Sequence, residues 1–266
     1  MRDSKGIVHS PEESRFNADA YSTESEFYGN GFVKKHYIDN PKALIIICPG
    51  GAYSWRSPRE GIPVAEKFNK LGYSCEILHY TCSDGSSPVY PRPQTELAMA
   101  ISAARKKFSR IIVMGFSAGG HLAASLAVMP EKYGKNARPD CAVLCYPVIT
   151  SGEKAHVRSI SNLVGNNEEL IREVSLEKHV DGNTCPCFIW TTATDESVPF
   201  ENSLMFKQAL DKYSVLNELV VFDSGVHGLS LGTADVSDSK RCVAPQIQKW
   251  PELASEFIER FVLKIK

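Results

Sequence analysis

Short apolar runs alternate along this chain with longer amphipathic stretches. Runs of strand length, rich in Val, Ile, Leu and Cys, occupy residues 43–48, 73–80, 110–115, 141–147, 187–193 and 218–223. Helices are predicted for the amphipathic or Ala-rich stretches between and after them, residues 60–72, 92–108, 118–128, 199–213 and 251–265. Residues 32–38 alternate between apolar and polar and predict an edge strand. Buried strands that alternate with helices indicate the α/β class, with a mostly parallel sheet covered on both faces.

The pattern also predicts the organisation of the chain. No internal repeat or low-complexity linker interrupts it, so we expect one domain over residues 32–266, preceded by an N-terminal extension of residues 1–31. Residues 150–184 are longer than a plain crossover needs. They form either an ordinary crossover with extra surface turns or a small lid over the strand ends. In parallel sheets, ligands bind at the carboxyl ends of the strands, and the chemistry is expected there.

One strand-to-helix junction carries a candidate nucleophile. The segment Gly-Phe-Ser-Ala-Gly matches G-x-S-x-G between a predicted strand and a predicted helix, with Ser117 at its centre. A serine on such a sharp turn is exposed to a ligand, and the small neighbours Gly115 and Gly119 let the backbone pass closely. The alternative is that Ser117 is only the N-cap of the helix.

A serine nucleophile needs a base and an orienting acid, in the chain order Ser, Asp or Glu, His. Of the seven histidines, His227 is the one that directly follows a late strand, in a loop flanked by glycines. Asp195 follows the strand before it and is the expected acid, with Glu196 and Asp223 as rivals. The alternatives are that His227 is an ordinary loop histidine and Asp195 an ordinary turn aspartate.

Besides the nucleophile and its base and acid, the site needs backbone N–H groups that stabilise an oxyanion. The run Pro-Gly-Gly-Ala after the strand at 43–48 permits close backbone approach, so the N–H groups of Gly51 and Ala52 are candidate donors. The N–H of Ala118, next to the serine, is the third. A simple Pro-Gly turn is the alternative for this loop.

Composition and charge exclude several classes of function. Formal net charge is −1, which gives no overall attraction to nucleic acid or anionic membranes, and neither is an expected partner. No secretory signal and no apolar run of membrane-spanning length is visible, so the expected compartment is the cytoplasm. The eight cysteines are expected to be buried free thiols. The pair Cys185 and Cys187 has neither zinc nor redox spacing, and no metal or cofactor is expected.

Four blocks in order resemble the esterase/lipase branch of the α/β-hydrolase fold, which includes bacterial acetylxylan-type and other carbohydrate esterases. They are CPGGAYSW, GFSAGGHLAA, TTATDESVPFENSLMF and VHGLSL, and the Trp250-Pro251 start of the last helix is also similar. The resemblance implies Ser117 as nucleophile, Asp195 as acid and His227 as base. Relatives often carry PGGGY or HGGG, so Ala52 is a departure, although an alanine retains its N–H.

The expected function is hydrolysis of a small-molecule ester with a short acyl group, such as acetyl on a sugar. The aromatic residues Tyr53, Trp55 and Tyr80, near the strand ends, would suit a sugar face. An amide hydrolase, such as an arylformamidase or small peptidase, is the first alternative, and a non-catalytic binding protein on the same fold is the second. The sequence leaves the oligomeric state open, and a homo-oligomer is compatible with it.

Overall fold

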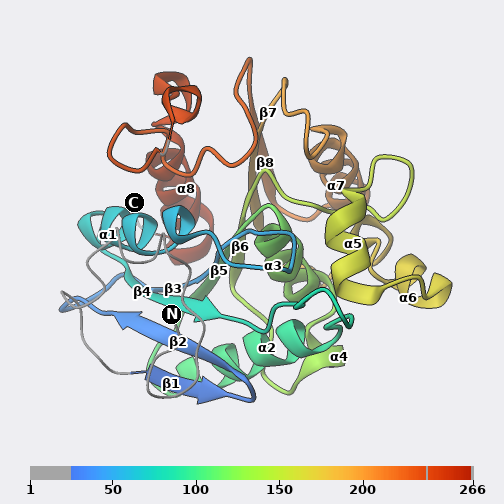
Figure 1. Cartoon of the computed structure of the whole chain (residues 1–266). Coiled ribbons are helices and arrows are strands. Elements are labelled where there is room, and N and C mark those ends of the chain that lie inside the picture. Colours follow the sequence, from blue (N-terminus) through green and yellow to red (C-terminus); the bar gives the residue numbers. More distant parts are fainter. Residues whose placement is uncertain (1–24, 238, 265–266) are drawn as a thin grey trace.

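The computed structural model describes residues 25–237 and 239–264, and its centre is one sheet of eight strands. In spatial order these are β1 (Ser25–Tyr28), β2 (Gly31–His36), β4 (Ser74–His79), β3 (Leu44–Cys48), β5 (Ile111–Phe116), β6 (Cys141–Cys145), β7 (Cys187–Thr192) and β8 (Asn217–Phe222). The strands from β4 to β8 run parallel, and β2 is antiparallel to both β1 and β4. The mostly parallel sheet expected from the sequence is confirmed (Figure 1).

The antiparallel end of the sheet differs from the prediction. The strand expected at 32–38 is the second in the sheet and not its edge, because β1 pairs with it from Ser25 opposite Lys34 to Tyr28 opposite Gly31. Its burial is correspondingly nearly continuous, with Val33 fully buried. The edge is β1, which lies within the stretch expected as an N-terminal extension. Residues 1–24 of that stretch lie outside the described residues.

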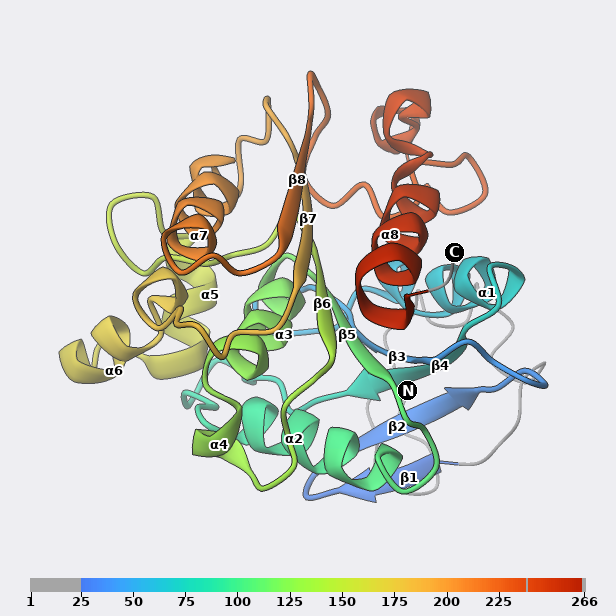
Figure 2. The same cartoon turned by 180° about the vertical axis from the view of Figure 1, so that it is seen from behind.

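Helices cover both faces of the sheet. One core packs beneath α2 (Arg92–Ala104), α3 (Ala118–Val128) and α7 (Glu201–Lys212), and the other beneath α1 (Ile62–Lys70) and α8 (Trp250–Ile258). Figures 1 and 2 show these two sets of helices on opposite sides of the sheet. All five predicted helices are present, and the last continues as a π-helical turn, Glu259–Leu263. None of the described helices is both long and apolar enough to cross a membrane.

The predicted insertion at 150–184 contains α5 (Val157–Val164), α6 (Glu168–Glu173) and the 3-10 turn Leu176–Lys178. Its apolar side chains Leu163 and Val174 are buried in the core on the α3 side. The Asn162 amide donates a 2.7 Å hydrogen bond to the carbonyl oxygen of Ala52, in the loop after β3. The insertion thus extends the helical layer beside α7 and contacts one of the strand-end loops (Figure 1).

The described residues include all eight cysteines, and each of them is a free thiol. Six are buried, and Cys82 and Cys242 are partly exposed. The expectation of burial therefore holds for six of the eight.

Candidate active site

The turn from β5 into α3 is strained at one residue. Ser117 has φ 53° and ψ −118°, in a region that residues with a side chain rarely occupy. A Cβ at Gly115 would lie 2.0 Å from the Gly119 carbonyl oxygen, and one at Gly119 would lie 2.0 Å from the Cys48 carbonyl oxygen. The two glycines of the motif are therefore required by close packing of backbone on both sides of the serine.

Three side chains from distant parts of the sequence meet at this turn. The Nε2 atom of His227 lies 2.8 Å from Ser117 Oγ, and its Nδ1 atom lies 2.6 Å from Asp195 Oδ2. They come from the loops after β5, β7 and β8, which end at the same edge of the sheet. A carboxylate can only accept, so Nδ1 carries the imidazole proton and Nε2 is free to accept from the serine hydroxyl.

The carboxylate of Asp195 is fixed in place by its own turn. Its second oxygen accepts hydrogen bonds of 2.9 Å from the N–H groups of both Ser197 and Val198. The side chain is 1% exposed, whereas the rivals Glu196 and Asp223 are exposed to solvent. Of the three candidate acids, Asp195 is therefore the one that is hydrogen-bonded to His227.

Two threonines that the sequence analysis missed anchor the histidine loop. The hydroxyl groups of Thr192 and Thr194 donate to the Gly225 carbonyl oxygen at 2.9 and 3.1 Å, and the Gly225 N–H donates to Thr194 Oγ1 at 2.9 Å. Both threonines stand at the end of β7, just before Asp195. Their position at the carboxyl end of a predicted strand, residues 187–193, was the available signal.

The loop after β3 lies against the serine turn. A Cβ at Gly50 would come within 2.8 Å of the Phe116 carbonyl oxygen and 3.0 Å of Ser117 Cβ. Gly51 has φ 131° and Ala52 has φ 53°, so two successive residues take unusual backbone conformations. Among the described residues, no hydrogen bond uses the N–H of Gly51, Ala52 or Ala118. These N–H groups are therefore available to a ligand oxygen, as oxyanion donors must be.

Comparison with known proteins shows the family of this chain. The family BD-FAE matches residues 33–210, more than half of the chain. The chain belongs to the BD-FAE family. Like the structurally similar proteins, this family member has the α/β-hydrolase fold that the sequence motifs implied.

Two curated relatives and one solved structure are similar to this BD-FAE chain. Endo-1,4-beta-xylanase B of Butyrivibrio fibrisolvens is 35% identical over 83% of the chain and 37% of the relative. The acetylxylan esterase of Xylanibacter ruminicola is 30% identical over 73% of the chain and 43% of the relative. The chain thus spans less than half the length of either. The acetyl ester-xyloside bifunctional hydrolase of Caldicellulosiruptor lactoaceticus is 33% identical, with a TM-score of 0.76 over 86% of this chain and 88% of that one.

Two further histidines of the BD-FAE chain lie near the site. His121, one turn into α3, is fully buried between the Tyr53 hydroxyl and the Val174 carbonyl oxygen, and burial lowers its pKa to about 4. His156, which precedes α5 in the insertion, is half-buried, and burial lowers its pKa.

The three aromatic residues suggested as a sugar face are not equivalent. Tyr53 and Tyr80 are fully buried, and Tyr80 donates a hydrogen bond to the Pro49 carbonyl oxygen. For these two residues the interpretation was wrong, because they support the loop after β3 from within. Trp55 is 44% exposed and follows the candidate oxyanion donors, so it alone of the three can contact a ligand.

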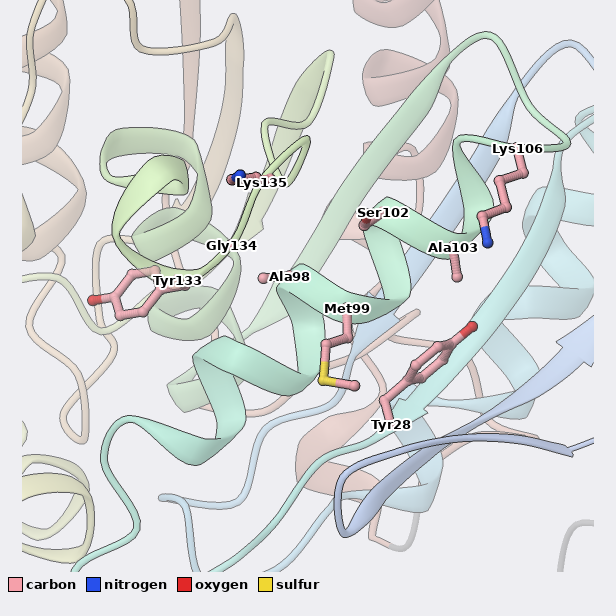
Figure 3. Close-up of a pocket in the computed structure, with 9 residues that line it drawn as sticks. All are labelled: Tyr28, Ala98, Met99, Ser102, Ala103, Lys106, Tyr133, Gly134 and Lys135. Atoms are coloured by element: carbon pink, nitrogen blue, oxygen red, sulfur yellow. The ribbon is translucent and has the colours of Figure 1, made fainter.

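A hollow of about 420 Å³ lies away from this site, along α2 and the turn after α4 (Pro130–Tyr133). Its lining includes Tyr28, Met99, Lys106 and Lys135, and Figure 3 shows Met99 on α2, Lys106 just after α2, Lys135 on the turn and Tyr28 on β1. None of the triad residues is part of it. Its lining contains no histidine and no carboxylate, so it offers no second set of residues like Ser117, His227 and Asp195.

Proposed function

We propose that this protein is a carboxylic ester hydrolase with Ser117 as nucleophile, His227 as general base and Asp195 as the acid that orients it. The observation that carries the proposal is the continuous chain of hydrogen bonds, 2.8 Å from serine to imidazole and 2.6 Å from imidazole to carboxylate. The esterase names of similar proteins support the same reaction class.

In the proposed mechanism, His227 removes the proton of Ser117 as the oxygen attacks the ester carbonyl. The new oxyanion is held by the N–H groups of Gly51, Ala52 and Ala118. Asp195 keeps the imidazole in the required tautomer and stabilises the imidazolium. The alcohol leaves with the proton from His227, and a water molecule then hydrolyses the acyl-enzyme by the same path. Every step uses protein groups, so the reaction requires no cofactor.

The substrate we propose is a short acyl ester, acetyl above all, on a xylan-type carbohydrate. Two similar proteins are named for acetyl esters of xylan or xylosides. Trp55, exposed beside the candidate oxyanion loop, offers an aromatic face to the sugar ring.

A panel of acyl substrates on the purified protein tests the proposal. We expect turnover of p-nitrophenyl acetate and acetylated xylo-oligosaccharides, with rates that fall for longer acyl chains and are abolished in Ser117→Ala. Labelling by a fluorophosphonate should occur on Ser117 alone. Hydrolysis of N-formylkynurenine without ester hydrolysis would identify an amide hydrolase. Folded wild-type protein that neither reacts with the label nor turns over any of these substrates would contradict the proposal.

A further inference from the structure

A buried carboxylate next to the triad has no part in the proposed mechanism. Glu60 is the last residue of the 3-10 turn Pro58–Glu60 and is 3% exposed. Its Oε2 accepts the N–H of Gly50 and its Oε1 accepts the hydroxyl of Tyr146, both at 2.7 Å. Burial raises the pKa of Glu60, and the hydrogen bonds from Tyr146 and Gly50 act in the opposite direction. Burial of a carboxylate costs folding free energy unless its hydrogen-bond partners are well placed, so a role for Glu60 in the site is worth testing.

One oxygen of Glu60 holds the candidate oxyanion loop. Gly50 directly precedes the proposed donors Gly51 and Ala52. A Cβ at Gly50 would lie 2.8 Å from Glu60 Oε2, so the carboxylate packs closely against the backbone there. Loss of this hydrogen bond would release the segment that carries two of the three donors.

The other oxygen reaches the loop of the base. Tyr146, just after β6, donates to Glu60 and accepts the N–H of Ser230 at 3.0 Å. Ser230 stands three residues after His227 and donates its hydroxyl to the Arg59 carbonyl oxygen at 2.5 Å. The Tyr146 ring also packs edge-on against the His227 imidazole, with centroids 5.1 Å apart.

We propose that Glu60 is a positioning residue that fixes the oxyanion donors and the base relative to each other. Its carboxylate bonds the loops after β3 and β6 directly and is connected to the loop after β8 through Tyr146. The inference rests on the proposed ester hydrolysis, since it concerns the geometry of that reaction. Preorganised donors contribute to catalysis only if they stay in place, and a displacement of about 1 Å can cost about 100-fold in rate.

The test compares Glu60→Gln with Glu76→Gln. Glu76, on β4, is a matched control: it is 2% exposed and accepts a tyrosine hydroxyl, that of Tyr37, and β3 separates its strand from β5, which precedes Ser117. We expect Glu60→Gln to lower kcat for p-nitrophenyl acetate about 10- to 100-fold with KM within about twofold. Glu76→Gln should keep kcat within about twofold, since it contacts no strand-end loop of the site.

A second readout separates positioning from loss of stability. A boronic acid forms a tetrahedral adduct with the serine and uses the oxyanion donors, so its affinity should fall in Glu60→Gln by about the same factor as kcat. In Glu76→Gln it should stay unchanged. If Glu60→Gln does not fold, Tyr146→Phe takes its place, because it cuts the connection to Ser230 and should lower kcat about 3- to 10-fold.

The outcomes distinguish this inference from the proposed function. Wild-type turnover that Ser117→Ala abolishes supports the function. If, in that background, Glu60→Gln matches Glu76→Gln in kcat and in boronic acid affinity, the positioning role is wrong and the function stands. If folded wild-type protein hydrolyses no ester, both proposals fail.

Discussion

Two regions around α3 repeat one arrangement with different chemistry. In each, an imidazole joins a hydroxyl group to an oxygen acceptor. At the edge of the sheet the order is Ser117, His227 and Asp195, with distances of 2.8 and 2.6 Å. Beneath the insertion it is Tyr53, His121 and the Val174 carbonyl oxygen, with distances of 2.9 Å on both sides.

The two imidazoles are opposite tautomers. The Val174 carbonyl oxygen can only accept, so His121 carries its proton on Nε2, whereas His227 carries it on Nδ1 opposite Asp195. His121 has a neutral acceptor and is fully buried, and burial lowers its pKa to about 4. The His227 side chain has a carboxylate group as its acceptor and is 21% exposed. With His227 as the base that we propose, the comparison attributes that role to a carboxylate partner and access to substrate, because His121 also has hydrogen bonds on both sides.

The strongest test of this contrast is to make the same substitution at both histidines. His227→Gln should lower kcat for p-nitrophenyl acetate by at least about 10⁴-fold, since the serine loses its proton acceptor. His121→Gln should keep kcat within about tenfold, because that imidazole touches neither Ser117 nor Asp195. Steady-state kinetics on both folded variants measure the two values of kcat and compare them with that of the wild type. We call Ser117, His227 and Asp195 the outer arrangement, and Tyr53, His121 and the Val174 carbonyl group the inner arrangement. A loss of comparable size in His121→Gln would mean that the inner arrangement takes part in the reaction.

Removal of the charge that distinguishes the two regions should have the next largest effect. Asp195→Asn preserves the shape of the side chain but favours the wrong tautomer of His227. We expect kcat to fall about 10³- to 10⁴-fold with a circular dichroism spectrum like that of the wild type. An asparagine variant that retains more than a tenth of the wild-type kcat would show that the carboxylate charge is unimportant, and the contrast with His121 would lose its basis.

The neutral state of His121 should be visible in the pH dependence of stability. Its folded pKa of about 4 lies below the ordinary value of 6.5, so the unfolded chain binds the proton more tightly. The stability contributed by burying the neutral ring is fully present above pH 6.5 and is lost as the pH falls towards 4. Over that whole range the loss amounts to about 3 kcal/mol, at ~1.4 kcal/mol per pH unit.

Urea unfolding of the wild type and His121→Gln between pH 4.5 and 7.5 measures this effect. The variant lacks the titrating group. The unfolding free energy of the wild type minus that of the variant should therefore fall by about 2 kcal/mol as the pH is lowered from about 7.5 to about 4.5. His36, whose pKa burial also lowers to about 4, is present in both proteins and cancels in the difference. A difference that stays constant with pH would contradict the burial of a neutral His121.

The sequence predicted the outer arrangement because each member has a local signal. Ser117 lies in a glycine-flanked turn, and Asp195 and His227 each follow an apolar strand. Parallel strands bring their carboxyl ends to one edge, so three local signals are enough to place three distant residues together. The strands of the parallel sheet and the helices were predictable for the same reason.

The inner arrangement and the Glu60 network have no such signal. Glu60 meets Tyr146 across 86 positions of sequence, and the contact depends on how a 3-10 turn packs under two strand-end loops. Tyr53 was predicted to face a sugar, because an aromatic residue after a strand can point outward or inward with the same sequence pattern. The edge strand β1 was missed because its four residues, SEFY, lack an apolar run.

The smallest predicted effect concerns the inner hydroxyl. Tyr53→Phe leaves the buried Nδ1 of His121 without its donor, and an unsatisfied buried acceptor costs about 1–2 kcal/mol of unfolding free energy. Tyr73→Phe is the matched control, because Tyr73 is also buried and its hydroxyl is hydrogen-bonded to the Ser255 hydroxyl. Ser255 keeps a second partner, Glu259, so this substitution should cost less unfolding free energy. Urea denaturation should rank Tyr53→Phe as the less stable variant, with kcat within about threefold of wild type in both.

Equal stability of the two variants would mean that the hydroxyl of Tyr53 does not satisfy His121. A fall in kcat of more than tenfold in Tyr53→Phe alone would mean that the inner arrangement holds the oxyanion loop, since Tyr53 directly follows Ala52, and the two regions would then be one functional unit.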